Sequence, residues 1–185
     1  MNDDVNELSV EFDRFDTRLL VALSCAAAER VLGVYDQFGS GDPNALREAV
    51  NSIWAWVETG QSSEATGADA SLLEEYVDVH FEEGDELMGQ VVASALRCIA
   101  AYKTHDIPTT CALETARAFA LNAEIATEID VLLQDAEISP SAESEEQAWR
   151  AAIKQVARGW SGPIHRTAFM GPAPSWMPDF VATSR

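Results

Sequence analysis

Residues 15–38 read FDTRLLVALSCAAAERVLGVYDQF, the clearest helical pattern in the chain. Asp16 is a good N-cap, because its carboxylate can accept a hydrogen bond from a free N–H group of the first turn. Apolar side chains then recur at helical spacing, at Leu19, Leu23, Ala27, Val31, Val34 and Phe38. Glycine-rich residues 39–41 end the pattern. The stretch therefore predicts one long helix.

Helical periodicity recurs along the rest of the chain, and no strand alternation stands out. Proline at position 43 suits a first helical turn, since its missing N–H costs no hydrogen bond there. After the first helix, the pattern predicts helices over residues 43–57, 71–81, 85–102, 109–134 and 144–160. Ser144 and Gln147 read as a capping box for the last one. We therefore expect an all-α fold, an antiparallel helical bundle of about five to seven helices.

The helix over residues 109–134 is apolar on most faces, which is typical of a central helix. After residue 161 the composition changes, and four prolines exclude a regular helix over residues 162–185. That segment is nevertheless rich in large apolar side chains: Phe169, Met170, Trp176, Met177 and Phe180. We expect a single helical domain over residues 1–161, with an extended Pro-rich C-terminal arm over residues 162–185 packed on it. The alternative is a docking peptide for a partner.

The chain is strongly acidic, with 31 Asp and Glu residues against 12 Lys and Arg residues and a net charge of −19. Direct binding to nucleic acid or to anionic membranes is disfavoured, because affinity for phosphate groups comes from Lys and Arg. No basic residue other than histidine lies between Arg47 and Arg97, or between Arg117 and Arg150. Either these segments form an electronegative surface that holds a basic partner, or they reflect generic acidity of the protein.

The first base-free segment supplies all of the candidate partner-binding residues. Its acidic candidates are Glu64, Asp69, Glu74, Glu75, Asp78, Glu82, Glu83, Asp85 and Glu86. Trp56 and Tyr76 are the candidate aromatic anchors, because aromatic side chains often contribute most of the binding energy at protein interfaces.

Standard catalytic and cofactor motifs are missing from the sequence. It has no GxSxG, GxxxxGK[ST], GxGxxG or HExxH motif. Cys25, Cys98 and Cys111 are far apart in apolar helical stretches, which indicates buried free thiols in a reducing compartment. We therefore expect no catalytic residue, no cofactor and no metal.

Glu124 and Glu128 require a separate interpretation, because they share one face of the most apolar helix. If they are buried, they form a carboxylate pair of the kind that binds metal ions inside helical bundles. If they are not, they lie at the solvent edge or pair with Arg117 or Lys103. Both interpretations are open at the level of sequence.

The order of motifs also resembles a known family. Residues 15–38 are followed by LREAVNSIWAWV at residues 46–57. The matching positions are Arg18, Cys25, Glu29, Arg30, Tyr35, Phe38, Arg47, Val50, Ile53 and Trp54. With them, residues 12–160 resemble bacterial domain-of-unknown-function family 416, although Gly33 replaces the family's proline. The resemblance implies an all-α fold without an established activity, and a link to bacterial toxin-neutralising systems.

These features predict a non-enzymatic acidic binding protein. The favoured function is that of a bacterial immunity protein, which neutralises a cognate toxin, encoded by a neighbouring gene, by contact with its basic surface. The chain shows no apolar leader segment and no apolar run of about 20 residues, so we expect a cytoplasmic protein. The alternatives are a structural or regulatory homodimer joined through Trp54, Trp56 and Trp160, a nucleic-acid mimic that blocks a DNA-binding protein, and a carboxylate-metal enzyme.

Overall fold

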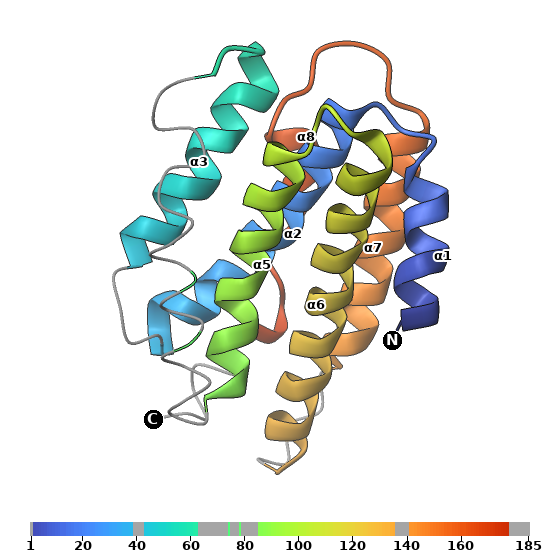
Figure 1. The fold of residues 1–185 in the computed structure, drawn as a ribbon. Coiled ribbons are helices and arrows are strands. Elements are labelled where there is room, and N and C mark those ends of the chain that lie inside the picture. Colours follow the sequence, from blue (N-terminus) through green and yellow to red (C-terminus); the bar gives the residue numbers. More distant parts are fainter. Residues whose placement is uncertain are drawn as a thin grey trace.

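The computed structural model describes residues 2–38, 43–62, 74, 78, 85–135 and 141–177. The regular elements within these residues are α1 (Asn2–Phe12), α2 (Thr17–Phe38), α3 (Pro43–Thr59), α5 (Glu86–Lys103), α6 (Pro108–Asp135), α7 (Ala142–Arg158) and α8 (Thr167–Met170). In the part of the chain that the structure describes, all regular elements are helices, which confirms the all-α prediction. Figure 1 shows α2, α5, α6 and α7 side by side, with α3 at one side of the bundle and α1 at the other.

Two helix starts follow the predicted capping chemistry. The Asp16 carboxylate accepts a hydrogen bond from the Arg18 backbone N–H at 2.9 Å, and α2 begins between them. The Asp85 carboxylate accepts one from the Met88 N–H at 3.2 Å at the start of α5. Both carboxylates satisfy N–H groups that the first turn of a helix leaves without an intrahelical partner.

The predicted start of the last helix is wrong. The N-cap of α7 is Ser141, whose Oγ accepts a hydrogen bond from the Ser144 N–H at 3.2 Å. Asp130 of α6 explains the earlier start, because its carboxylate accepts hydrogen bonds from the N–H groups of Ala142 and Glu143 at 2.7 and 3.0 Å. A side chain from another helix thus satisfies the first turn of α7, which the local sequence pattern does not reveal.

Helices α2 and α6 form the centre of the bundle. Every residue from Leu20 to Ala28 is fully buried, and α2 contacts α3, α5, α6 and α8. The predicted central helix over residues 109–134 is α6, which contacts α1, α2, α5 and α7. Alanine, serine and cysteine make up most of the buried middle of α2, and their small side chains let the neighbouring helices approach closely.

The sequence pattern did not predict α1. Its apolar side chains at Val5, Leu8 and Phe12 have helical spacing, but the acidic residues around them mask the pattern. Phe12 is fully buried and meets Phe119 of α6 edge to face, with ring centroids 5.3 Å apart. This contact places α1 against the outer face of α6.

The C-terminal arm packs on the bundle as far as Met177. Ile164, Phe169 and Trp176 are buried, and the short helix α8 lies within the arm. Gly171 has a φ of +62°, and a Cβ there would lie 3.2 Å from the Trp149 Cδ1, so glycine suits this turn for two reasons. Residues 178–185, with Phe180, lie outside the described residues.

The helix predicted over residues 71–81 also falls largely outside the described residues, which there include only Glu74 and Asp78. Both of these are helical and exposed. Within the described residues, every helix is too short or too polar to cross a membrane.

Candidate partner-binding surface

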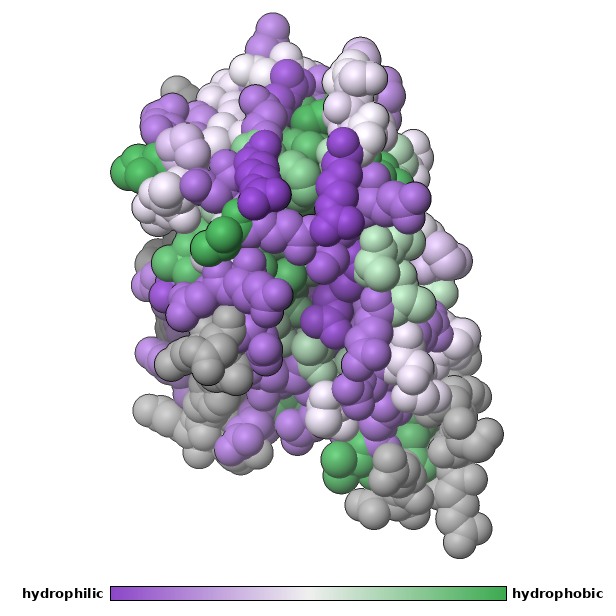
Figure 2. All heavy atoms as spheres, turned by 90° about the vertical axis from the view of Figure 1, so that its right-hand side faces the viewer, coloured by the Kyte–Doolittle hydropathy of each residue, from purple (hydrophilic) through white to green (hydrophobic). Residues whose placement is uncertain are grey.

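Ion pairs inside the molecule occupy many of its basic side chains. Seven of the twelve Lys and Arg residues pair with carboxylates of the described part of the chain: Arg30, Arg47, Arg97, Arg117, Lys154, Arg158 and Arg166. Because the chain has 31 acidic residues, this pairing leaves a large surplus of carboxylates. Figure 2 shows the face that carries α1, on which hydrophilic side chains prevail and apolar ones lie between them.

The structure describes only some of the predicted acidic contact residues. Glu74, Asp78 and Glu86 are exposed, and Asp85 is half-buried at the start of α5. The remaining candidates lie outside the described residues: Glu64, Asp69, Glu75, Tyr76, Glu82 and Glu83. A contact role for these side chains remains a prediction.

Trp56, one of the two candidate aromatic anchors, is buried. Trp56 is 7% exposed, and its ring centroid lies 5.1 Å from that of Tyr102 and 4.8 Å from that of His105. This side of α3 faces the C-terminal end of α5, so the indole belongs to the helix interface. Trp54 is also buried. Two of the three tryptophans through which a homodimer would be joined are therefore inaccessible to a second chain.

A groove that sequence reasoning did not predict runs along α6. One half has a volume of about 480 Å³ and is lined by Val5, Asn6, Ala93, Arg97, Leu113, Arg117, Ala120, Leu121 and Glu124. The other half has a volume of about 690 Å³ and is lined by Asp4, Leu8, Gln90, Ala120, Ala123, Glu124, Thr127, Glu128, Val131 and Arg150. Ala120 and Glu124 line both halves, so the two adjoin at these residues.

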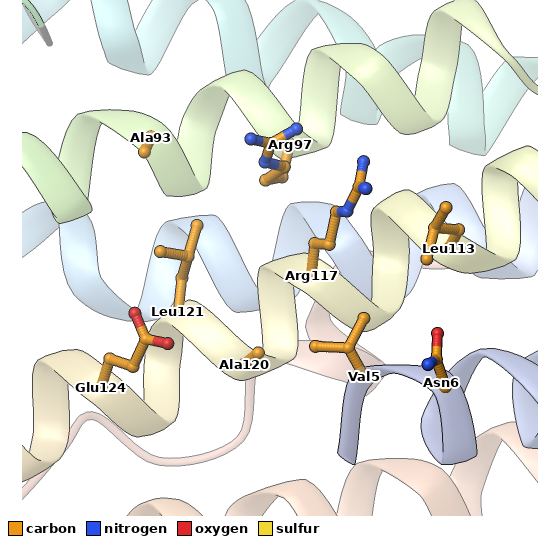
Figure 3. A pocket seen from close by; sticks show the side chains of 9 residues that line it. All are labelled: Val5, Asn6, Ala93, Arg97, Leu113, Arg117, Ala120, Leu121 and Glu124. Carbon is orange, nitrogen blue, oxygen red and sulfur yellow. The ribbon is translucent and has the colours of Figure 1, made fainter. Parts of the chain in front are cut away.

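The first half of the groove has a basic end. Figure 3 shows Arg97 of α5 and Arg117 of α6 on the same side of the pocket, while Val5 and Asn6 approach from α1. Glu114 lies between the two guanidinium groups and accepts hydrogen bonds from Arg97 at 3.0 Å and from Arg117 at 2.6 Å. Arg117 thus pairs with Glu114 on its own helix, which speaks against the alternative that it pairs with Glu124 or Glu128.

The second half of the groove is acidic. Glu124 and Glu128 are half-buried along its edge, which agrees with the solvent-edge interpretation of the pair. Burial raises the pKa of Glu124 and lowers the pKa of Arg150. Val131 is 55% exposed beside them, so this half combines charge with accessible apolar surface. Among the described residues, no cluster of three or more His, Cys, Asp or Glu side chains could hold a metal ion.

A buried ion pair that the sequence did not predict joins α2 to α7. The Arg30 Nε donates to the Glu146 Oε1 at 2.5 Å, and the two residues are 4% and 0% exposed. The Arg30 guanidinium also donates to the Pro172 carbonyl at 2.8 Å and lies 4.9 Å from the Trp149 ring centroid. Burial raises the pKa of Glu146, and the Arg30 charge offsets part of that rise.

A second ion pair, beside the first, also holds the arm. Arg166 donates its Nε to Glu29 at 3.0 Å and its Nη1 to Asn51 at 2.8 Å. The Trp54 indole N–H donates to the same Glu29 carboxylate at 2.9 Å. The signal in the sequence was a charged pair, Glu29-Arg30, at the end of a long apolar run. Such a pair needs internal partners if the run is buried, and the structure shows that these partners come from α7 and the arm.

The raised pKa values predict how stability depends on pH. A carboxyl group whose pKa is higher in the folded state binds protons more readily there, so stability is gained as the pH falls through the folded pKa. For Glu124 and Glu146, we expect the melting temperature to rise as the pH is lowered from 7 towards about 5. Thermal unfolding followed by circular dichroism at each pH tests this.

The variant Glu146→Gln separates this effect from the general relief of negative charge. We expect its melting temperature to change less steeply with pH than that of the wild-type protein, because one carboxyl with a raised pKa has been removed. A melting temperature that falls steadily from pH 7 to about 5, or an equal slope in both proteins, would contradict the assignment.

Comparisons of the chain with family models, curated proteins and solved structures found no match. The resemblance of residues 12–160 to family 416 therefore remains a prediction.

Proposed function

We propose that this chain is a non-enzymatic, acidic binding protein that neutralises a basic partner by direct contact, as a bacterial immunity protein neutralises its cognate toxin. The observation that carries the proposal is the internal pairing of the basic side chains described above. Each pair also uses a carboxylate, so the excess of 19 acidic over basic residues remains as negative charge that can attract a partner. The proposed compartment is the cytoplasm, where free thiols stay reduced.

The proposed interface combines acidic and apolar surface. Glu74, Asp78 and Glu86 supply exposed carboxylates, and the acidic half of the groove adds Glu128 beside the exposed Val131. Long-range attraction accelerates the encounter with a basic surface, and apolar contact then slows dissociation. A toxin that attacks nucleic acid suits such a surface, since its substrate cleft is rich in Lys and Arg.

The test is a calorimetric titration of the purified chain with the protein encoded by the neighbouring gene. We expect the dissociation constant to rise at least about tenfold between about 50 and 300 mM NaCl, because salt screens attraction between exposed charges. The triple variant Glu74→Gln, Asp78→Asn and Glu86→Gln should bind about tenfold more weakly, mainly through slower association.

A control variant removes negative charge elsewhere on the surface. The variant Glu7→Gln and Asp13→Asn removes two exposed carboxylates of the α1 region, against three in the triple variant, and should weaken binding less for each charge removed. Failure to bind the neighbouring protein, or an affinity independent of salt, would refute the proposal. Competition of the chain with duplex DNA for a DNA-binding protein would instead favour the nucleic-acid mimic.

A further inference from the structure

Two of the three cysteines meet inside the bundle. Cys25 of α2 and Cys98 of α5 are fully buried, and their sulfur atoms lie 3.0 Å apart although 73 positions separate them in the sequence. Both are free thiols. Neither takes part in the surface proposed for the partner, so their juxtaposition requires its own explanation.

The distance between the sulfur atoms indicates which chemistry the pair suits. Two thiolates on one tetrahedral zinc ion, each about 2.3 Å from the metal, lie about 3.8 Å apart. The sulfur atoms of a disulfide lie about 2.0 Å apart. At 3.0 Å, Cys25 and Cys98 are too close to share a zinc ion and about 1 Å from bonding distance. Small side-chain rotations can close such a gap without moving a helix.

We propose that Cys25 and Cys98 form a reversible disulfide between α2 and α5 when the protein is exposed to a peroxide. One cysteine loses its proton and, as thiolate, attacks an oxygen of hydrogen peroxide; the O–O bond breaks, a sulfenic acid forms, and the departing hydroxide takes up that proton as water. The second thiol attacks that sulfur, the S–O bond breaks, and a second water leaves as the S–S bond forms. The two thiols lose two electrons and two protons, and the peroxide is reduced to two water molecules.

The burial of the pair sets the rate of this reaction. Burial raises the pKa of Cys25 well above its ordinary value, and contact with Cys98 raises it further. The thiolate therefore forms only when the helices open locally, and oxidation of the native protein is slow at neutral pH. Mild denaturant or a higher pH accelerates it.

The third cysteine provides an internal control. Cys111 is also buried, and burial raises its pKa to about 12. Its sulfur contacts the Thr17 carbonyl oxygen at 3.8 Å, at the N-terminal end of α2. It thus shares the environment of the pair without a sulfur partner at bonding distance.

The bond would stabilise the folded protein. It closes a chain segment of 73 positions. This lowers the conformational entropy of the unfolded chain and raises the melting temperature by about 10 °C. The same segment contains the predicted acidic contact residues, so both ends of that region would be covalently joined.

Peptide mapping of the full chain tests the proposal directly. The protein is treated with hydrogen peroxide, its remaining thiols are alkylated, and trypsin is added without reductant. Cleavage after Arg and Lys places Cys25, Cys98 and Cys111 in separate peptides, residues 19–30, 98–103 and 104–117. We expect one linked species, 19–30 with 98–103, which disappears after treatment with dithiothreitol.

The controls follow from the same chemistry. Cys111→Ala should keep the linked species and the rise of about 10 °C, and Cys98→Ser should lose both. Mapping of the wild-type protein remains decisive if a variant fails to fold. The proposal is overturned if peptide 104–117 is one of the disulfide-linked peptides, or if peptides 19–30 and 98–103 stay unlinked even in mild denaturant. Separate sulfinic acids, or dimers joined by a disulfide between two chains, would overturn it as well.

Discussion

Replacement of Arg30 by methionine is expected to lower the free energy of unfolding by about 3–5 kcal/mol, because it leaves a buried carboxylate without its counter-charge. Arg30 and Glu146 are almost completely inaccessible to solvent and are joined at 2.5 Å. The substitution also removes the hydrogen bond to the Pro172 carbonyl and the stacking over Trp149. Urea unfolding followed by circular dichroism measures the change.

Two further variants identify the cause of that loss. The double variant Arg30→Met and Glu146→Gln should recover part of the stability, since no buried charge then lacks a partner. Arg47→Met removes an ion pair with Asp36 whose side chains are 42% and 31% exposed, and we expect less than about 1 kcal/mol. A double variant as unstable as Arg30→Met would show that packing, and not charge, accounts for the loss.

Replacement of Trp176 by alanine is expected to lower the free energy of unfolding by about 3–5 kcal/mol, as is usual for a large buried aromatic side chain. Trp176 is fully buried near the end of the described arm. Beside it, Ser175 donates its backbone N–H to Glu145 at 2.8 Å. The loss of the indole should therefore release the arm from α7 as well as leave a cavity.

The control for this prediction is His165→Ala, an exposed position of the same arm. We expect it to change the free energy of unfolding by less than about 0.5 kcal/mol. Limited proteolysis gives a second measurement, because a released arm is cut faster than a packed one. If Trp176→Ala unfolds at the wild-type urea concentration, the arm does not belong to the core, and the docking-peptide interpretation regains support.

Local sequence chemistry was enough to predict most helices and two of their starts. A helix repeats every 3.6 residues and its first turn exposes N–H groups, so the apolar spacing after Asp16 and the carboxylate of Asp85 can be interpreted without knowledge of the fold. The same is true of the net charge and of the base-free segments, which are properties of composition. The helix α1 was missed because its acidic residues weaken the apolar pattern.

Contacts between distant segments depended on how the helices pack. The carboxylate of Asp130 in α6 sets the start of α7, and contact with Tyr102 of α5 makes Trp56 a core residue. The partners of Arg30 and the contact between Cys25 and Cys98 likewise join residues from separate helices. Spacing along the chain specifies which face of a helix is apolar. The neighbour that meets that face depends on the relative position and rotation of whole helices, which the packing of the entire core decides.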